Sequence, residues 1–212
     1  MTHRAVVYLP DPTSRAAAAT QVAGRAMLLR TLMTLARAGV SRIGLPGLFR
    51  DPTIEAAISA DTHLREAVAW LDRLNAREAS EWSRGPLLLL PPNVLLDPPS
   101  LRKLLAGRDP GEGIALEESK GSPWPILLAP SALSAALWER LAEGTPLGDD
   151  LDVQLRQGRM TLVAGAGFFV PVLDEASRSE AEATLFRGLG IRADSHVDRV
   201  INRPCSRWVA RG

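Results

Sequence analysis

The sequence predicts a three-layer α/β domain with a mostly parallel sheet, and three observations lead to that prediction. Short apolar runs bounded by proline or glycine alternate with segments of helical spacing, which is the pattern of successive βα units. The 212 residues have the length of one ordinary domain with a short appendage, and 46% of them are apolar, enough for a substantial core. The formal net charge of +1 gives no basis for general nucleic-acid binding.

The first third of the chain shows the alternation most clearly. Residues 5–9 are the first candidate for a buried strand and residues 41–45 the second. Between them, residues 27–38 carry leucines at i, i+4 and i+7, which predicts a helix that ends at Gly39. Asp51 is followed by a proline, a favourable N-cap and first-turn pair, and predicts a second helix.

Residues 64–74 fit either a helix or a strand. The strand is preferred because it keeps the βα rhythm, with a helix following over residues 74–82. Residues 87–90 are four leucines between prolines, too short for a helix and too apolar for an edge, which predicts a central strand. The remaining expected elements are helices over 98–105, 131–143 and 175–189 and strands over 114–118, 126–129, 160–164 and 168–173, the last two antiparallel in character.

The composition restricts the compartment and the kind of site. Cys205 is the single cysteine and the three histidines are widely spaced, which favours a reducing compartment and argues against structural zinc. The apolar run at residues 5–9 stops at Pro10, so no secretory signal is expected. The longest uncharged stretch, residues 121–138, is interrupted by prolines and would span a bilayer poorly.

Residues 190–212 differ in character from the domain predicted over residues 1–189. They carry five arginines against two aspartates, a local charge of +3, while the rest of the chain sums to −2. Trp208 and the basic side chains suit a juxtamembrane segment that faces anionic lipid from the cytoplasmic side. The alternative is that the arginines only solvate a frayed terminus. Four of them recur at every fourth position: Arg199, Arg203, Arg207 and Arg211.

Three segments carry a resemblance to known families. Residues 22–45 (VAGRAMLLRTLMTLARAGVSRIGL) resemble the segment that follows the phosphate loop of sugar-phosphate and alditol-phosphate nucleotidyltransferases. Residues 87–98 (LLLLPPNVLLDP) are similar to the strand and turn that carry a metal-binding aspartate in those enzymes. Residues 194–207 (DSHVDRVINRPCSR) look like the linker into the membrane part of CDP-alcohol phosphatidyltransferases that carry such a domain at their N-terminus.

The resemblance implies a Rossmann-like nucleotidyltransferase fold of the cytidylyltransferase type, with a mostly parallel mixed sheet. It also implies a chain that ends just before a transmembrane enzyme would begin. The aspartate series of that membrane enzyme is absent here, so the sequence is either a soluble piece of such a protein or a stand-alone relative. CTP is the nucleotide that the resemblance implies, and a membrane phosphatidyltransferase domain and a second copy in a homodimer are the implied protein partners.

Nucleotidyl transfer needs backbone N–H groups on a glycine-rich loop to hold the triphosphate and a cation to offset its charge. The loop after the first strand, residues 10–21, contains no glycine, and its two prolines remove N–H donors. The lysine expected there from the resemblance has no counterpart. Arg15 or Arg25 would have to supply the positive charge near the nucleotide.

The carboxylates that would hold Mg²⁺ are also incomplete. By the resemblance, Asn93 replaces the metal-binding aspartate, and a neutral amide is a weak Mg²⁺ ligand. Asn93 is therefore a candidate for nucleotide binding, together with Arg15 and Arg25. Asp97 is expected to cap the helix that follows it. Asp174 is either a second metal carboxylate or a helix N-cap. Mg²⁺ is expected as a cofactor only if the chain is an active nucleotidyltransferase. A solvated turn is expected for Glu117, Glu118 and Lys120, with contact to a sugar or alcohol phosphate as the alternative. A surface loop or a helix start is expected for Asp149, Asp150 and Asp152.

Two functions from different classes follow, with an unrelated α/β binding domain as a third. The first is a degenerate, non-catalytic nucleotidyltransferase-like module that supports a CDP-alcohol phosphatidyltransferase in phospholipid synthesis at the inner face of the membrane. The second is an active CTP-dependent cytidylyltransferase that makes a CDP-alcohol from a phosphorylated alcohol. The stripped loop favours the first function, and the resemblance by itself favours the second.

Overall fold

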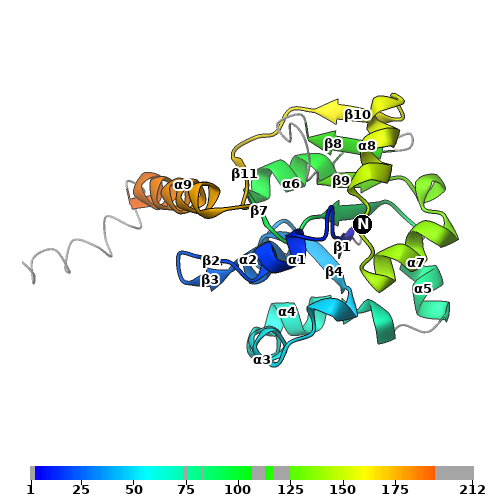
Figure 1. Ribbon diagram of the computed structural model, residues 1–212, viewed down its shortest axis with the longest axis horizontal. Coiled ribbons are helices and arrows are strands. Elements are labelled where there is room, and N and C mark those ends of the chain that lie inside the picture. Colours follow the sequence, from blue (N-terminus) through cyan, green and yellow to red (C-terminus); the bar gives the residue numbers. More distant parts are fainter. Residues whose placement is uncertain (1–2, 74–75, 83, 107–112, 117–124, 194–212) are drawn as a thin grey trace, which may run out of the picture.

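A seven-stranded sheet forms the centre of the molecule (Figure 1). The computed structural model describes residues 3–73, 76–82, 84–106, 113–116 and 125–193. The sheet has the strand order β10-β8-β9-β6-β1-β4-β5, and every strand runs parallel to the others except β9, which is antiparallel to both neighbours. Its strands are β1 (His3–Val7), β4 (Val40–Leu45), β5 (Val68–Trp70), β6 (Leu87–Leu90), β8 (Gly113–Leu116), β9 (Ile126–Leu128) and β10 (Met160–Val163).

The central strands are apolar on both sides because helices cover both faces of the sheet. In β6, Leu88 and Leu90 enter one buried cluster, whereas Leu87 and Leu89 enter the other. Successive strand side chains point to opposite faces, so four consecutive leucines are stable only in a strand with no solvated face. The prediction of a central strand over residues 87–90 is therefore confirmed.

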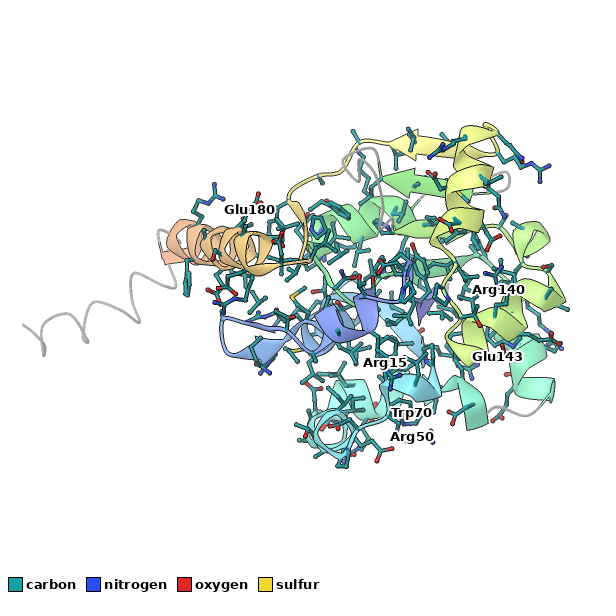
Figure 2. The ribbon with its side chains drawn as sticks, in the orientation of Figure 1. Arg15, Arg50, Trp70, Arg140, Glu143 and Glu180 are labelled. Carbon is teal, nitrogen blue, oxygen red and sulfur yellow. The ribbon has the colours of Figure 1, made fainter. Side chains whose placement is uncertain are left out.

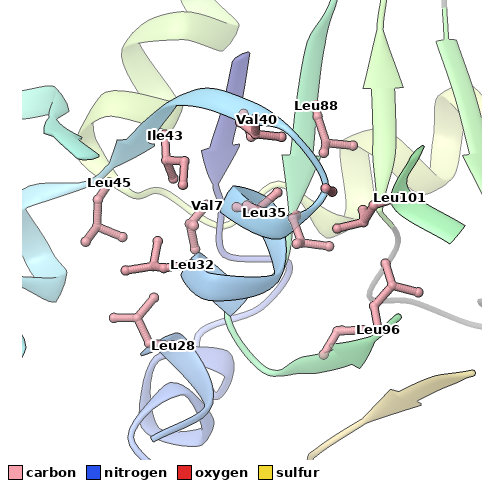
Figure 3. Packing of buried hydrophobic residues seen from close by; sticks show 14 of the residues in the cluster. Val7, Leu28, Leu32, Leu35, Val40, Ile43, Leu45, Leu88, Leu96 and Leu101 are labelled. Atoms are coloured by element: carbon pink, nitrogen blue, oxygen red, sulfur yellow. The ribbon is translucent and has the colours of Figure 1, made fainter. Parts of the chain in front are cut away.

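Two helical layers enclose the sheet. Leucines of α2 pack against β1, β4 and β6 in the first layer, as Figure 3 shows for Leu32 and Leu35. That layer contains α1 (Ser14–Ala18), α2 (Met27–Arg37), α3 (Pro52–Ala60), α4 (Thr62–Ala67), α6 (Pro98–Leu105) and the 3-10 turn η1 (Gly47–Phe49). The opposite layer contains α5 (Ala76–Trp82), α7 (Ala135–Glu143), α8 (Gly148–Arg156) and the 3-10 turns η2 (Leu71–Arg73) and η3 (Pro130–Ala132).

A third, smaller cluster lies at the end of the molecule where α9 (Glu175–Ala193) projects (Figure 1). It joins α9 to the hairpin of β2 (Gln21–Val22) and β3 (Arg25–Ala26) and to the antiparallel pair of β7 (Val94–Leu96) and β11 (Phe169–Pro171). Its buried side chains are Val22, Met27, Leu95, Val170, Val172 and Ala181. None of the helices in the described ranges is long and apolar enough to cross a bilayer.

Three sequence predictions about the fold need correction. Only residues 68–70 of the predicted strand over 64–74 form a strand, because Asp61 accepts hydrogen bonds from the His63 and Leu64 amides and starts α4 instead. The strand β10 is parallel to β8 rather than antiparallel, because α7 and α8 carry the chain along the sheet and back to its amino edge. The predicted helix over residues 131–143 starts at residue 135, where Ser134 caps it.

Several elements lie where no element was expected, among them the short strand β7 in the predicted turn after residue 90. The loop predicted over residues 10–21 contains α1, and the hairpin β2–β3 follows it. The aspartates at positions 149, 150 and 152 belong to α8, in agreement with the helix start that was one of their two expected settings. Several residues singled out in the sequence lie outside the described residues: Glu117, Glu118, Lys120, Arg199, Arg203, Cys205, Arg207, Trp208 and Arg211.

Candidate functional site

The carboxyl ends of β1, β4 and β6 meet at one edge of the sheet because these strands are parallel. The chain moves outward from β1 through β4 to β5 and then returns to the other side of β1 with β6, so the strand order reverses between β1 and β6. A crevice outside the carboxyl ends of the strands at such a reversal is the usual ligand site of open α/β sheets. The loop at residues 10–13, which connects β1 to α1, borders this position.

Asp11 occupies the amide groups of that loop. Its Oδ1 accepts hydrogen bonds from the backbone N–H of Thr13 (2.7 Å) and of Ser14 (3.0 Å), and its Oδ2 accepts one from the Ser14 hydroxyl (2.7 Å). The Thr13 hydroxyl also donates to Oδ1. Pro10 and Pro12 have no N–H to offer. The donors with which a phosphate-binding loop would hold an anion are therefore bound to an anion of the chain itself.

The electrostatic setting keeps Asp11 charged. Partial burial works to raise the pKa of its carboxyl, but the hydrogen bonds from Thr13 and Ser14 outweigh burial and hold the pKa below its ordinary value of 3.8. Ser14 is fully buried, so its hydroxyl is not open to a ligand. At neutral pH a second anion at this loop would meet both occupied donors and a negative charge.

The two candidate cations lie on different elements. Arg15 is exposed on α1, directly after the Asp11 loop (Figure 2). Arg25 is exposed on β3 of the hairpin, where its guanidinium contacts the Met33 sulfur. Burial, together with the neighbouring charge of Arg25, lowers the pKa of Arg30. No contact described for either candidate joins Arg15 to Arg25, and their assignment to a nucleotide stays a prediction.

Asn93 links two segments of the third cluster. It is fully buried, and its side-chain Nδ2 donates to the Val172 backbone carbonyl (3.1 Å). The backbone carbonyl of Asn93 accepts from the Val172 N–H (2.8 Å). Its Oδ1 is buried and has no hydrogen-bond partner among the described residues. The carboxamide thus joins the start of β7 to the end of β11, and a role in nucleotide binding stays a prediction.

Asp174 is the N-cap of α9. Its Oδ1 accepts from the Ser177 N–H (2.8 Å) and from the Ser177 hydroxyl (2.6 Å), and these bonds lower the pKa of the carboxyl. The helix-cap alternative is therefore present in the structure, while a metal role stays a prediction. In the part of the chain that is described, no three His, Cys, Asp or Glu side chains gather closely enough to hold a metal ion.

Asp97 is a second carboxylate that is bound internally. It caps α6, as predicted, by accepting from the Ser100 N–H (3.0 Å) and the Ser100 hydroxyl (2.7 Å). The Ser100 oxygen in turn accepts from the N–H groups of Ala166 (2.9 Å) and Gly167 (3.1 Å). A Cβ on Gly167 would lie 2.6 Å from the Asp97 carboxylate, so this turn needs glycine.

A cation at the carboxyl ends of β4 and β5 is neutralised. The Arg50 guanidinium lies 4.8 Å from the ring centre of Trp70 and pairs with Asp72 (3.1 Å) and Glu55 (3.2 Å) (Figure 2). Cation–π stacking and two carboxylates hold it in place. Arg50 therefore does not offer a free charge to a phosphate.

Asp11 is not among the site residues predicted from the sequence. The available signal is local: an aspartate followed two and three positions later by threonine and serine is a turn and capping pattern. The pairs Asn93–Val172 and Ser100–Gly167 have no comparable signal, because their partners are far apart along the chain.

Comparison with known proteins supports the fold. No protein-family model and no curated protein sequence matches this chain. It is similar to a nucleotidyl transferase from Methanothermobacter thermautotrophicus, with a TM-score of 0.62 and 15% identity over 88% of this chain and 99% of that one. It is similar to 4-diphosphocytidyl-2C-methyl-D-erythritol synthase from Anaerococcus prevotii, with a TM-score of 0.58 and 14% identity over 87% and 96%.

A third similar structure is a CMP:2-keto-3-deoxy-manno-octonic acid synthetase in complex with CTP, with a TM-score of 0.51 and 14% identity over 88% of this chain and 99% of that one. The structural similarity establishes the architecture. Sequence identities this low leave the activity open. The chain has the Rossmann-like α/β fold of nucleotidyltransferases, with a mostly parallel mixed sheet, as predicted.

Proposed function

We propose that this chain is a nucleotidyltransferase-like domain that no longer transfers nucleotides and that serves as a non-catalytic module of a CDP-alcohol phosphatidyltransferase in phospholipid synthesis. The observation that carries the non-catalytic part is the Asp11 carboxylate on the N–H groups of Thr13 and Ser14. It stands where a nucleotidyltransferase of this fold would need free donors for the triphosphate.

The argument rests on competition for the same donors. A phosphate group could take the N–H groups of Thr13 and Ser14 only if the Asp11 carboxylate left them, and each hydrogen bond to a charged group contributes about 1.5–3 kcal/mol. The displaced carboxylate would still be close by and would repel the incoming charge. Because Asn93 is neutral and buried, it adds no charge to attract Mg²⁺.

Calorimetric titration of the whole chain with CTP, with and without Mg²⁺, tests this proposal. The expected result is no heat of binding up to millimolar nucleotide. Asp11→Gly frees the two amides and removes the charge, so weak binding is expected to emerge in that variant. Asp61→Gly is the matched control, because the Asp61 carboxylate also accepts from two backbone amides but does so at the start of α4.

The alternative is an active CTP-dependent cytidylyltransferase, and the observation in its favour is the CTP complex of a similarly folded synthetase. In that case the exposed Arg15, with Arg25, would offset the charge of the phosphates, and Asp174 with Asn93 would hold Mg²⁺. Micromolar binding of CTP by the unaltered chain that weakens on Arg15→Ala or Asp174→Ala would favour this function and contradict the first.

The membrane part of the proposal rests on the basic residues of the tail, 190–212. We propose that they meet anionic lipid at the cytoplasmic face, next to the phosphatidyltransferase. Flotation of the whole chain with anionic and with neutral vesicles at low salt tests it, with Arg199, Arg203 and Arg207 replaced by glutamine as the comparison. Equal recovery with both vesicle types would contradict it. Sedimentation velocity tests the proposed homodimer.

A further inference from the structure

The connection between α7 and α8, residues 144–147, and the first residue of α8, Gly148, lie against the segment that leads into the Asp11 loop. The Leu147 N–H donates to the Leu9 carbonyl (2.9 Å), and the Gly148 N–H donates to the Pro10 carbonyl (2.8 Å). These two consecutive backbone bonds hold the two residues immediately before Asp11. Residues 144–148 are called the strap below.

The strap is packed too closely to slide. A Cβ on Gly148 would lie 2.4 Å from the Pro10 carbonyl oxygen, so the two backbones are in direct contact. At its other end, a Cβ on Gly144 would lie 1.7 Å from a methyl group of Leu48, in the turn after β4. Leu147 is 1% exposed and belongs to the same buried cluster as Tyr8 of the segment after β1.

Arg140 ties the strap to both helices. From α7, its Nη2 donates to the Pro146 carbonyl (2.8 Å) and its Nη1 pairs with Asp150 of α8 (2.5 Å). Figure 2 shows this side chain on the part of the molecule opposite to α9. One guanidinium therefore holds the strap between the helices that flank it, through charged hydrogen bonds that are partly exposed to water.

We propose that the strap keeps the loop after β1 in its self-capped form and that Arg140 is the positioning residue of this device. The Asp11 carboxylate reaches the Thr13 and Ser14 amides from a backbone whose two preceding carbonyls, those of Leu9 and Pro10, are bound to the strap. The strap thus fixes the position from which the carboxylate accepts, and its opening is expected to shift Asp11 and expose the two amides. The inference rests on the proposed function, since it concerns how the occupied donors of that site stay occupied.

Such a coupling links the contact between α7 and α8 to the loop after β1. Loss of the Arg140 contacts would loosen the strap and expose the Thr13 and Ser14 amides to water. The strap itself is short and has few backbone bonds to break, as expected of a segment that opens locally while the sheet stays folded.

Hydrogen exchange of the whole chain, measured without any nucleotide, tests the coupling. Arg140→Ala is expected to speed exchange of the Leu147, Gly148, Thr13 and Ser14 amides together, by about fivefold to tenfold for the loss of a partly exposed charged contact. Arg156→Ala is the matched control, because Arg156 also pairs with an aspartate of α8 but only within that helix, and it should leave all four rates unchanged. Amides of β6 report that the core stays folded.

Faster exchange in the strap with unchanged rates at Thr13 and Ser14 would overturn the proposal, as would unchanged rates in both segments. If Arg140→Ala does not fold, Asp150→Asn removes one of the two contacts of the guanidinium and must show the same coupled increase, at smaller size. Binding of CTP by the unaltered chain would overturn the proposed loss of activity and leave this exchange result unaffected, so the two failures are distinguishable.

Discussion

Replacement of Asp11 by alanine leaves the amides of Thr13 and Ser14, and both of their hydroxyls, without the internal acceptor that they have now. The N-cap position of α1 is Thr13, but the Asp11 carboxylate accepts the same kind of amide bond as a capping side chain. Loss of a capping side chain costs about 0.5–2 kcal/mol of unfolding free energy. Because Asp11 accepts from two amides, the loss should exceed the lower end of this range. Water can form hydrogen bonds to part of the freed groups at this partly exposed site, which reduces the loss. The expected decrease is about 1 kcal/mol, in the middle of that range.

Urea denaturation followed by tryptophan fluorescence measures this decrease, and a thermal scan should show a Tm lower by about 2–4 °C for a domain of this size. Asp61→Ala, which removes a cap with two amide bonds at a distant helix, should cost a similar amount and calibrates the value.

The effect must depend on pH in one direction. The pKa of Asp11 is lower in the folded chain than its ordinary value of 3.8, so its contribution is present above pH 3.8 and is lost as the pH falls through the lower, folded-state pKa. The difference between the unaltered chain and Asp11→Ala should therefore shrink below about pH 4. A loss under about 0.3 kcal/mol at neutral pH, or a difference that does not change with pH, would refute the assignment of Asp11 as the acceptor of these amides.

Three further predictions use paired positions. Leu89→Ala should lower the unfolding free energy by about 2–5 kcal/mol in urea denaturation because Leu89 is fully buried, whereas Leu162→Ala, at a side chain 47% exposed, should change it by less than about 0.5 kcal/mol. Gly144→Ala and Gly158→Ala both place a side chain at positive φ, which costs about 1–2 kcal/mol, and Gly144→Ala should cost clearly more because of the contact with Leu48. Asp174→Ala should speed amide exchange in the first turn of α9 at neutral pH and have no effect once the carboxyl, whose folded pKa is lowered, is protonated in both states.

The apolar runs were the reliable part of the sequence prediction. Residues 87–90 form a central strand and Pro98–Leu105 a helix capped by Asp97, because the unbroken apolar run and the capping residue are both visible within a few consecutive residues. The same local logic explains why α9 starts after Asp174.

Features that depend on distant partners could not be predicted in this way. The direction of β10 follows from the length of two helices that cross the sheet, not from any residue in the strand. The burial of Asn93 depends on Val172, which lies 79 positions further along the chain. Residues 64–74 satisfy both helical and strand periodicity, and Asp61, three positions before that window, decided the outcome for its first residues.

The hairpin β2–β3 closes against the far end of the chain. The Ala23 N–H donates to the Glu182 carboxylate across 159 positions, and Val22 is buried in the same cluster as Ala181. During synthesis at about 5–20 residues per second, the hairpin must therefore wait on the order of ten seconds or more after it leaves the ribosome before α9 arrives. Until then Val22 and Met27 have no cover from that helix, so this end of the domain completes its apolar cluster last.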